Sequence, residues 1–154
     1  MQALLDITEY HVDNVEIRAN PDYKECDVAS GNIKVDFDIK QNNDNPLLFM
    51  ITLFIELNNS KKALSSAEYK IKFDITGYFS FSEGTPEETV DKMIAPSGLS
   101  ILYGVARGVL AQITGNFKHG KFILPTLNFI EIIKDKFKDM EENSVLPPKK
   151  KKAV

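Results

Sequence analysis

The first half of the chain alternates apolar and polar residues, which is the pattern of β-strands. Residues 33–40 and 67–81 place apolar side chains at every second position, which predicts strands with one buried and one solvated face. Residues 47–57 are apolar on both faces, as in a central strand. In residues 4–18 the alternation changes phase near Asp13, which predicts a β-bulge. Short polar connections between these four segments favour an antiparallel sheet.

The second half changes to helical spacing. Apolar residues recur at three- and four-residue intervals between Ser97 and Gly115, which fit an N-cap and a left-handed C′ glycine. A shorter helix is expected to start at Thr85 and to end at Pro96. A last helix follows its N-cap, Asn128. Strands followed by helices predict an α+β fold, with a four-stranded antiparallel sheet and helices packed on one face.

The composition is that of a soluble globular protein, with 43% hydrophobic and 27% charged residues among 154. We expect one domain over residues 1–142 and a flexible Pro/Lys-rich tail over 143–154, whose lysines form a solvated tail or attract phosphate or acidic lipid. The net charge of −3 favours neither a nucleic-acid nor a membrane partner. We find no secretory signal and no apolar run long enough to span a membrane, so a cytoplasmic location is expected.

Residues that could carry chemistry are few and scattered. His11, His119 and Cys26 show no metal-ligand spacing, and surface positions are expected for both histidines. Glu87 and Glu88 could form an acid–base pair, but they also suit a helix N-terminus. Neither a phosphate-binding loop nor a nucleophile elbow occurs. We therefore expect no enzyme activity, no catalytic or metal-binding residue and no cofactor.

Apolar residues are more numerous near the last loop and on the strands than a small core needs. The helices could simply cover them, since small domains also leave apolar surface exposed. The alternative is a groove for an apolar segment of another polypeptide. The candidate client-binding residues are Phe117, Phe122, Ile123, Leu124, Leu127, Phe129, Tyr78 and Phe54.

Small residues form a stripe along the long helix. They are Gly104, Gly108, Ala111 and Gly115. Each glycine inside a helix costs about 1 kcal/mol relative to alanine, so these glycines need a structural reason. A flat stripe lets another backbone approach closely, and we expect it to contact the same helix of another subunit across a twofold axis.

Two motifs resemble the SecB family of protein-export chaperones. Residues 101–107 read ILYGVAR and residues 124–129 read LPTLNF, while Gly-Tyr-Phe at 77–79 falls where that family ends its fourth strand. The order of elements over residues 5–138 also fits. Gly104 stands where the family has proline and Gly108 where it has glutamate, and the chain is less acidic than familiar members. The sequence thus resembles a divergent SecB-like protein.

The resemblance implies an ATP-independent holdase, a tetramer built as a dimer of dimers, that binds unfolded or pre-export polypeptides in apolar grooves. Two alternatives stay open, a SecB-like chaperone that controls a toxin–antitoxin pair and a non-chaperone interaction scaffold. Familiar members bind a basic tail of the motor SecA through acidic residues on the exposed sheet face. Here Lys72 and, by a looser alignment, Arg18 fall near those positions, and Lys70 lies on the same solvated face as Lys72, so weak or no SecA binding is expected.

Overall fold

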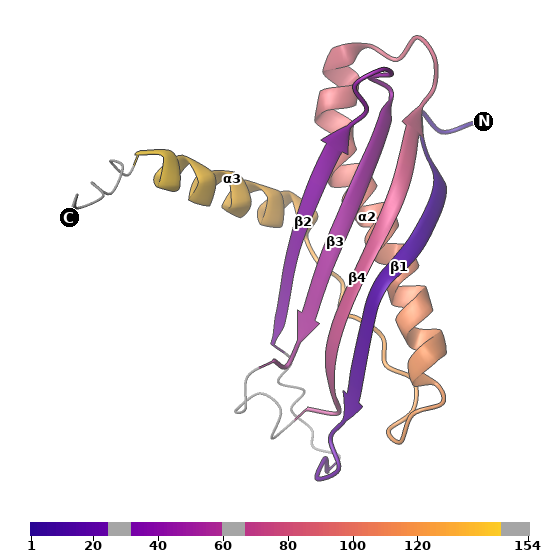
Figure 1. Ribbon diagram of the computed structural model, residues 1–154, viewed down its shortest axis with the longest axis vertical. Helices are drawn as coiled ribbons and strands as arrows, with labels where there is room; N and C mark the ends of the chain where they lie inside the picture. The colour runs from indigo at the N-terminus through magenta and orange to yellow at the C-terminus, as the bar shows by residue number, and fades with distance from the viewer. Residues whose placement is uncertain (25–31, 60–66, 146–154) are drawn as a thin grey trace, which may run out of the picture.

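A computed structural model describes residues 1–24, 32–59 and 67–145, the side chains of 143–145 excepted. The described residues form one antiparallel sheet and two helices (Figure 1), which confirms the predicted α+β fold. The elements are β1 (Leu5–Ala19), β2 (Ile33–Gln41), β3 (Leu48–Leu57), β4 (Tyr69–Phe81), α2 (Glu87–Thr114) and α3 (Phe129–Val145).

The sheet has the strand order β1-β4-β3-β2, so the first two strands of the chain lie at opposite edges (Figure 1). The connection between them must therefore cross from one edge to the other. Residues 20–32 make this connection, of which 25–31, with Cys26, lie outside the described residues. The register of β1 against β4 slips between Val12 and Asn14, which confirms the predicted bulge.

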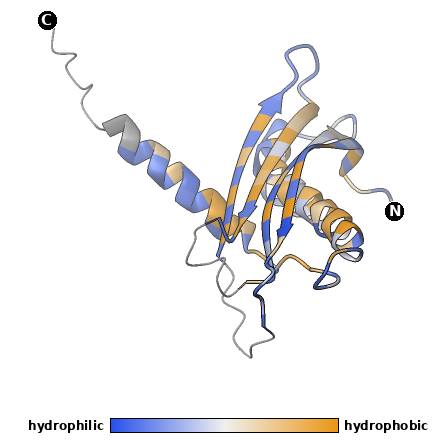
Figure 2. Ribbon diagram, turned by 60° about the horizontal axis from the view of Figure 1, so that its bottom comes forward, coloured by the Kyte–Doolittle hydropathy of each residue, from blue (hydrophilic) through white to orange (hydrophobic). Residues whose placement is uncertain are grey.

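One face of the sheet, here called the helix face, is covered by α2 and holds the core (Figures 1 and 2). Neither of the two described helices covers the opposite face, here called the open face. Two glycines allow the close packing of α2. A Cβ on Gly98 would lie 2.5 Å from Ile51 Cδ1, and one on Gly77 would lie 2.9 Å from Leu102 Cδ1. At both sites a core side chain lies against the glycine backbone, so a Cβ would require that side chain to move.

Helix α2 is a single helix of 28 residues, and this corrects the prediction that Pro96 ends a first helix. A proline inside a helix removes one backbone hydrogen bond and disfavours the helical conformation just before it. Val90 and Ile94 before the proline and Leu99 after it are all buried in the same core. Their burial holds both halves in line and outweighs the local cost.

The predicted helix ends also differ from the structure. Ser97 lies inside α2, and Thr85 donates its hydroxyl to the Ser82 carbonyl at 2.6 Å instead of capping the helix. Pro86 is the N-cap residue, without a side-chain hydrogen bond. Gly115 has a φ of −55°, so the predicted left-handed cap is wrong. Short-range signals located these ends to within a few residues but not their geometry.

Helix α3 begins as predicted. The Oδ1 atom of Asn128 accepts hydrogen bonds from the backbone N–H groups of Ile130 at 3.2 Å and Glu131 at 3.4 Å, as an N-cap does. The helix then extends past β2 and away from the sheet (Figure 1). It continues to Val145, three residues into the range assigned to the tail, and residues 146–154 lie outside the described part of the chain.

Candidate functional site

Two of the eight predicted client-binding residues lie in the core. Leu124 is 0% exposed and Phe129 is 5% exposed. The ring of Phe129 packs edge-on against Tyr103, with the ring centroids 5.3 Å apart. The Leu124 side chain therefore offers no surface to a client, and Phe129 offers only a small one, where it lines a hollow between α2 and α3. Both side chains pack the segment between α2 and α3 onto the body of the protein.

Three more predicted residues are half-buried. Phe117 and Phe122 both meet Tyr69 edge-on, each with ring centroids 6.1 Å apart, and Leu127 packs at the border of the core. Tyr69 donates its hydroxyl to the Gly120 carbonyl at 2.7 Å. These aromatic rings therefore fix the end of α2 to β4, and only part of each remains accessible.

The remaining three are accessible but do not lie together. Ile123 is 55% exposed beside the segment that follows α2. Phe54 is 39% exposed, and it lies with the half-buried Tyr78 on the open face. The structure thus separates the predicted site into two surfaces on opposite sides of the sheet.

A hollow of about 750 Å³, here called the α2–α3 groove, lies where the two helices approach each other. Ser100 and Ile101 line it from α2, Leu127 lines it from the segment before α3, and Ile130 lines it from the start of α3. None of its lining residues is charged. Ile130 is 57% exposed and continues the groove outward. The groove is therefore an accessible, uncharged surface with apolar side chains on both walls.

The wall of this groove is held by hydrogen bonds from α2. Tyr103 donates its hydroxyl to the Pro125 carbonyl at 2.5 Å, and the Nε of Arg107 donates to the Leu124 carbonyl at 3.0 Å. Thr114 Oγ1 accepts from the Phe122 N–H at 2.8 Å. Burial raises the pKa of Tyr103 to about 12, and Arg107 partly opposes that shift. An irregular segment next to α2 is thus made rigid enough to shape a surface.

Sequence reasoning missed Tyr103 and Arg107 as structural partners. Both stand in the ILYGVAR motif, and both carbonyls they bind stand in the LPTLNF motif. The joint occurrence of the two motifs in the sequence was the signal for these contacts. Together the motifs attach the segment before α3 to helix α2.

Helix α3 is attached to the edge strand β2 through Lys136. Its Nζ lies 2.7 Å from Asp36 Oδ1, 4.2 Å from the centroid of the Phe37 ring, and donates to the Phe37 carbonyl. The hydrogen bond from Lys136 holds the pKa of Asp36 below its ordinary value. A second hollow of about 490 Å³ lies beside this contact, between β2 and α3, and Val35, Ile132 and Met140 also line it.

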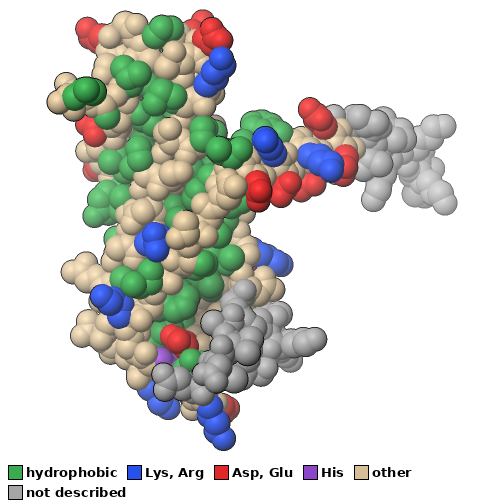
Figure 3. Space-filling model, turned by 180° about the vertical axis from the view of Figure 1, so that it is seen from behind, with side chains coloured by type: hydrophobic (Ala, Val, Ile, Leu, Met, Phe, Trp, Pro, Cys, Tyr) green, Lys and Arg blue, Asp and Glu red, His purple; other side chains and the backbone are tan. Residues whose placement is uncertain are grey.

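The outward side of α2 is uncharged over most of its length. Arg107 is the one charged residue between positions 93 and 115. Figure 3, which views the protein from this side, shows hydrophobic side chains along the helix and few charges over its middle. Gly104 and Gly108 face outward, since a Cβ at either would meet nothing within 4 Å, and Gly115 is also exposed. Ala111 is half-buried.

By length and composition alone α2 could cross a membrane, which corrects the expectation that no apolar run is long enough. Its inner side forms the core against the sheet, and this packing accounts for the apolar residues on that side.

Among the described residues, no group of three His, Cys, Asp or Glu side chains could hold a metal ion. His11 is exposed and lies 3.0 Å from Asp13. The ring of His119 is half-buried, and its Nε2 lies 2.6 Å from the Asn20 carbonyl oxygen. The two histidines thus make separate local contacts.

The fold has a neighbour among solved structures. No protein-family model matches the sequence, and no curated protein does. The chain is similar to the Mycobacterium tuberculosis SecB-like chaperone Rv1957, solved with a ChAD peptide from the Rv1956 HigA1 antitoxin. The TM-score is 0.56 and the identity 15%, covering 80% of this chain and 90% of that one. A Streptococcus agalactiae protein of unknown function has a TM-score of 0.39 and 11% identity, covering 79% and 97%. The likeness to Rv1957 shows a SecB-like fold.

Proposed function

We propose that this protein is an ATP-independent chaperone of the SecB-like type, which holds unfolded polypeptide segments in the α2–α3 groove. The observation that carries the proposal is that groove, an accessible surface without charge on a SecB-like fold. Apolar segments are the part of an unfolded chain that most needs cover from water. The proposed contact residues in the groove are Ile101, Leu127 and Ile130. Ile123 and the accessible edges of Phe117 and Phe122 lie outside the groove and are proposed as additional contacts.

Binding of many different clients requires several weak contacts in series. Apolar contact has no directional requirement, so one groove can accept many sequences. An oligomer would present several copies of the groove to one client, and linked contacts multiply affinity. We propose a homo-oligomer, of the dimer-of-dimers kind that the resemblance implies. The uncharged outward side of α2, with Gly104 and Gly108, is its proposed interface.

Control of a toxin–antitoxin pair is the second candidate within the same chemistry. The neighbour Rv1957 was solved with an antitoxin peptide, and this favours a polypeptide client of that kind. Mass spectrometry of proteins that co-purify from the native host separates the candidates. A single small antitoxin would favour toxin–antitoxin control, and many precursor proteins would favour export.

The direct test is suppression of aggregation. The purified protein should slow aggregation of a chemically unfolded client, followed by light scattering, with no nucleotide present. The proposal includes no catalytic activity, no cofactor and no membrane association. We propose a cytoplasmic location. If aggregation proceeds at the same rate with and without the protein, the chaperone proposal fails and a plain interaction scaffold is favoured.

A further inference from the structure

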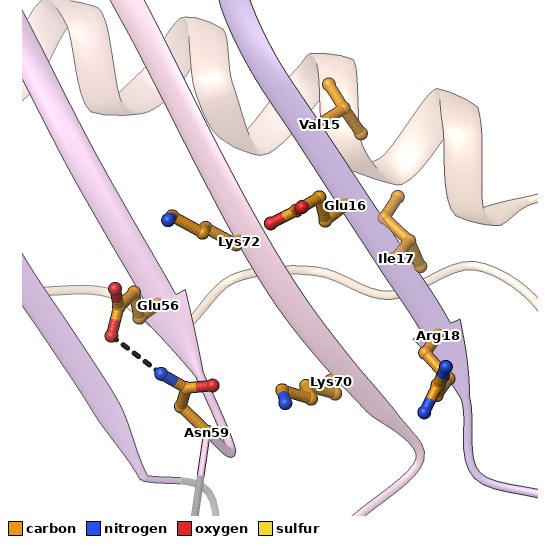
Figure 4. A pocket seen from close by; sticks show the side chains of 8 residues that line it. All are labelled: Val15, Glu16, Ile17, Arg18, Glu56, Asn59, Lys70 and Lys72. Atoms are coloured by element: carbon orange, nitrogen blue, oxygen red, sulfur yellow. Dashed lines mark hydrogen bonds between the residues drawn. The ribbon is translucent and has the colours of Figure 1, made fainter.

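The open face of the sheet carries a hollow of about 670 Å³ that the proposed chaperone function does not use. It lies on the side of the sheet away from the α2–α3 groove, over the ends of β1, β4 and β3 (Figure 4). Arg18, Lys70 and Lys72 bring three cationic side chains to it, and Glu16 and Glu56 bring two carboxylates. The cations exceed the carboxylates by one.

Two of these cations oppose each other directly. Arg18 on β1 is the register partner of Lys70 on β4. Like charges at directly opposite positions of an antiparallel pair destabilise the sheet. In residues 1–24, 32–59 and 67–145, no carboxylate lies within salt-bridge distance of either side chain. The unfavourable pair is therefore not compensated within this part of the chain.

The neighbouring row has a different charge order. Lys72 pairs in register with Glu16 on one side and with Glu56 on the other, so the row reads negative, positive, negative. The Glu56 carboxylate also accepts a hydrogen bond from Asn59 at 3.1 Å, which fixes it at the rim (Figure 4). The hollow thus combines an uncompensated cationic pair with a row of alternating charge.

We propose that this hollow binds a carboxylate-rich polypeptide segment, whose acidic side chains lie between Arg18 and Lys70. Arg18 and Lys70 stand at opposed positions of neighbouring strands and both line the hollow, and an Arg can bind a carboxylate through two N–H groups. The alternating row favours a peptide over a nucleic acid. A phosphate backbone carries negative charge at every step and would be repelled by Glu16 and Glu56. A peptide can place uncharged or basic groups over these glutamates.

The test is fluorescence anisotropy with a dye-labelled peptide of about ten residues, the length of a strand on this face, in which Asp and Glu alternate with Ser and Thr. The wild type should bind it with an affinity that falls as salt rises, because the contact is electrostatic. The double variant Arg18→Gln/Lys70→Gln should bind about tenfold more weakly, as expected for the loss of two charged contacts. The matched control is Lys134→Gln/Lys138→Gln on α3, which changes the net charge equally and should bind within about twofold of the wild type.

A thermal melt without peptide shows that the variants fold. Removing either cation of the opposed pair should leave the protein at least as stable as the wild type, because it relieves repulsion.

Three results would contradict the proposal. If both double variants lose binding equally, the loss comes from the change in net charge and the proposed site is wrong. If a peptide with Asn and Gln in place of Asp and Glu binds equally well, carboxylates are not what the hollow recognises. If a single-stranded oligonucleotide binds saturably and the acidic peptide does not, the ligand is a nucleic acid and not a peptide. The aggregation assay is independent of these outcomes, so the chaperone proposal can stand or fall separately.

Discussion

Tyr103 in the middle of α2 donates a hydrogen bond to the carbonyl of Pro125, at a distance of 2.5 Å and across 22 positions of the chain. This bond connects the long helix with the irregular segment that leads into α3. The Tyr103 side chain is buried, and its ring also packs on Phe129. This hydroxyl is therefore one of three groups on α2, with Arg107 and Thr114, that hold the segment and with it one wall of the α2–α3 groove.

Replacement of Tyr103 by Phe should lower the free energy of unfolding by about 1–2 kcal/mol, because the Pro125 carbonyl loses its buried donor while the ring packing remains. Hydrogen exchange should increase in residues 121–128 more than in β3 and β4. Chemical denaturation and exchange mass spectrometry measure the two effects. An unchanged exchange rate in this segment would show that Arg107 and Thr114 hold it without Tyr103.

The same substitution changes the dependence of stability on pH. Burial raises the pKa of Tyr103 to about 12 from its ordinary value of 10.0. Between these values the unfolded state loses the proton first, so stability is complete below pH 10 and falls as the pH rises toward 12. The Tyr103→Phe variant should lack this part of the decline. Denaturation curves of both proteins over that range give the comparison, and parallel curves would contradict a buried phenol.

The strands could be predicted from the sequence because each has one buried face. Alternation of apolar and polar residues has a period of two, and a phase change such as the one near Asp13 has a single structural meaning. All four strands and the bulge at Asp13 were found in this way. These features depend on local pattern alone.

Helix continuity at Pro96 and the burial of Leu124 depend on distant contacts. Local signals favour a break at Pro96, but core packing on both sides of it decides the outcome. The Leu124 side chain packs in the core, and Arg107, 17 positions earlier, binds its carbonyl. Neither contact leaves a periodic trace in the sequence, so the site could be predicted only as a set of apolar residues without a common surface.

Lys136 attaches α3 to β2, and its replacement by Ala should loosen the helix without unfolding the sheet. The side chain contributes an ion pair to Asp36 and a cation–π contact with Phe37, together about 1–2 kcal/mol. Hydrogen exchange of α3 should increase, whereas exchange of β4 should not. Lys134→Ala on the same helix is the control, since Lys134 is exposed and has no ion pair among the described residues.

The attachment should also respond to acid. Lys136 lowers the pKa of Asp36 from its ordinary value of 3.8, so the contribution of this pair is present above that value and is lost as the pH falls through the lower folded pKa. Protection of α3 should therefore approach that of Lys136→Ala only at pH values well below 3.8. Full protection at the lowest pH would assign the attachment to the apolar contacts instead.

Substitutions of Gly108 should have different effects in an oligomer and in a monomer. A Cβ at this position meets nothing within 4 Å in one chain, so Gly108→Ala should stabilise an isolated subunit by about 0.5–1 kcal/mol. Gly108→Leu should break a higher oligomer into smaller units, because the proposed helix contact leaves no room for the side chain. Light scattering measures the mass of each variant. A monomeric wild type would end the oligomer proposal.

The α2–α3 groove and the open face can be distinguished as client surfaces by single substitutions. Ile130 lines the groove, and Phe54 is the predicted client residue on the open face. Both are partly exposed, so Ile130→Ser and Phe54→Ser should fold. Loss of about 1 kcal/mol of apolar contact should weaken client affinity about fivefold in Ile130→Ser. Phe54→Ser should protect a client as well as the wild type does, and the reverse result would move the client site to the open face.

The open face also bears on the expected lack of a SecA partner. Arg18 and Lys70 oppose each other there, and Lys72 lies one row away in the same hollow, so the predicted cations do lie together. A basic, zinc-bearing tail would meet like charge at this end of the sheet, which opposes docking and electrostatic steering. Calorimetry with such a tail peptide should therefore detect weak or no binding at low salt, where screening is least. Charge reversal at Arg18 and Lys70 to Glu should increase binding of the tail if repulsion is the cause. Tight binding by the wild type that fades as salt rises would contradict this prediction and favour the standard export role.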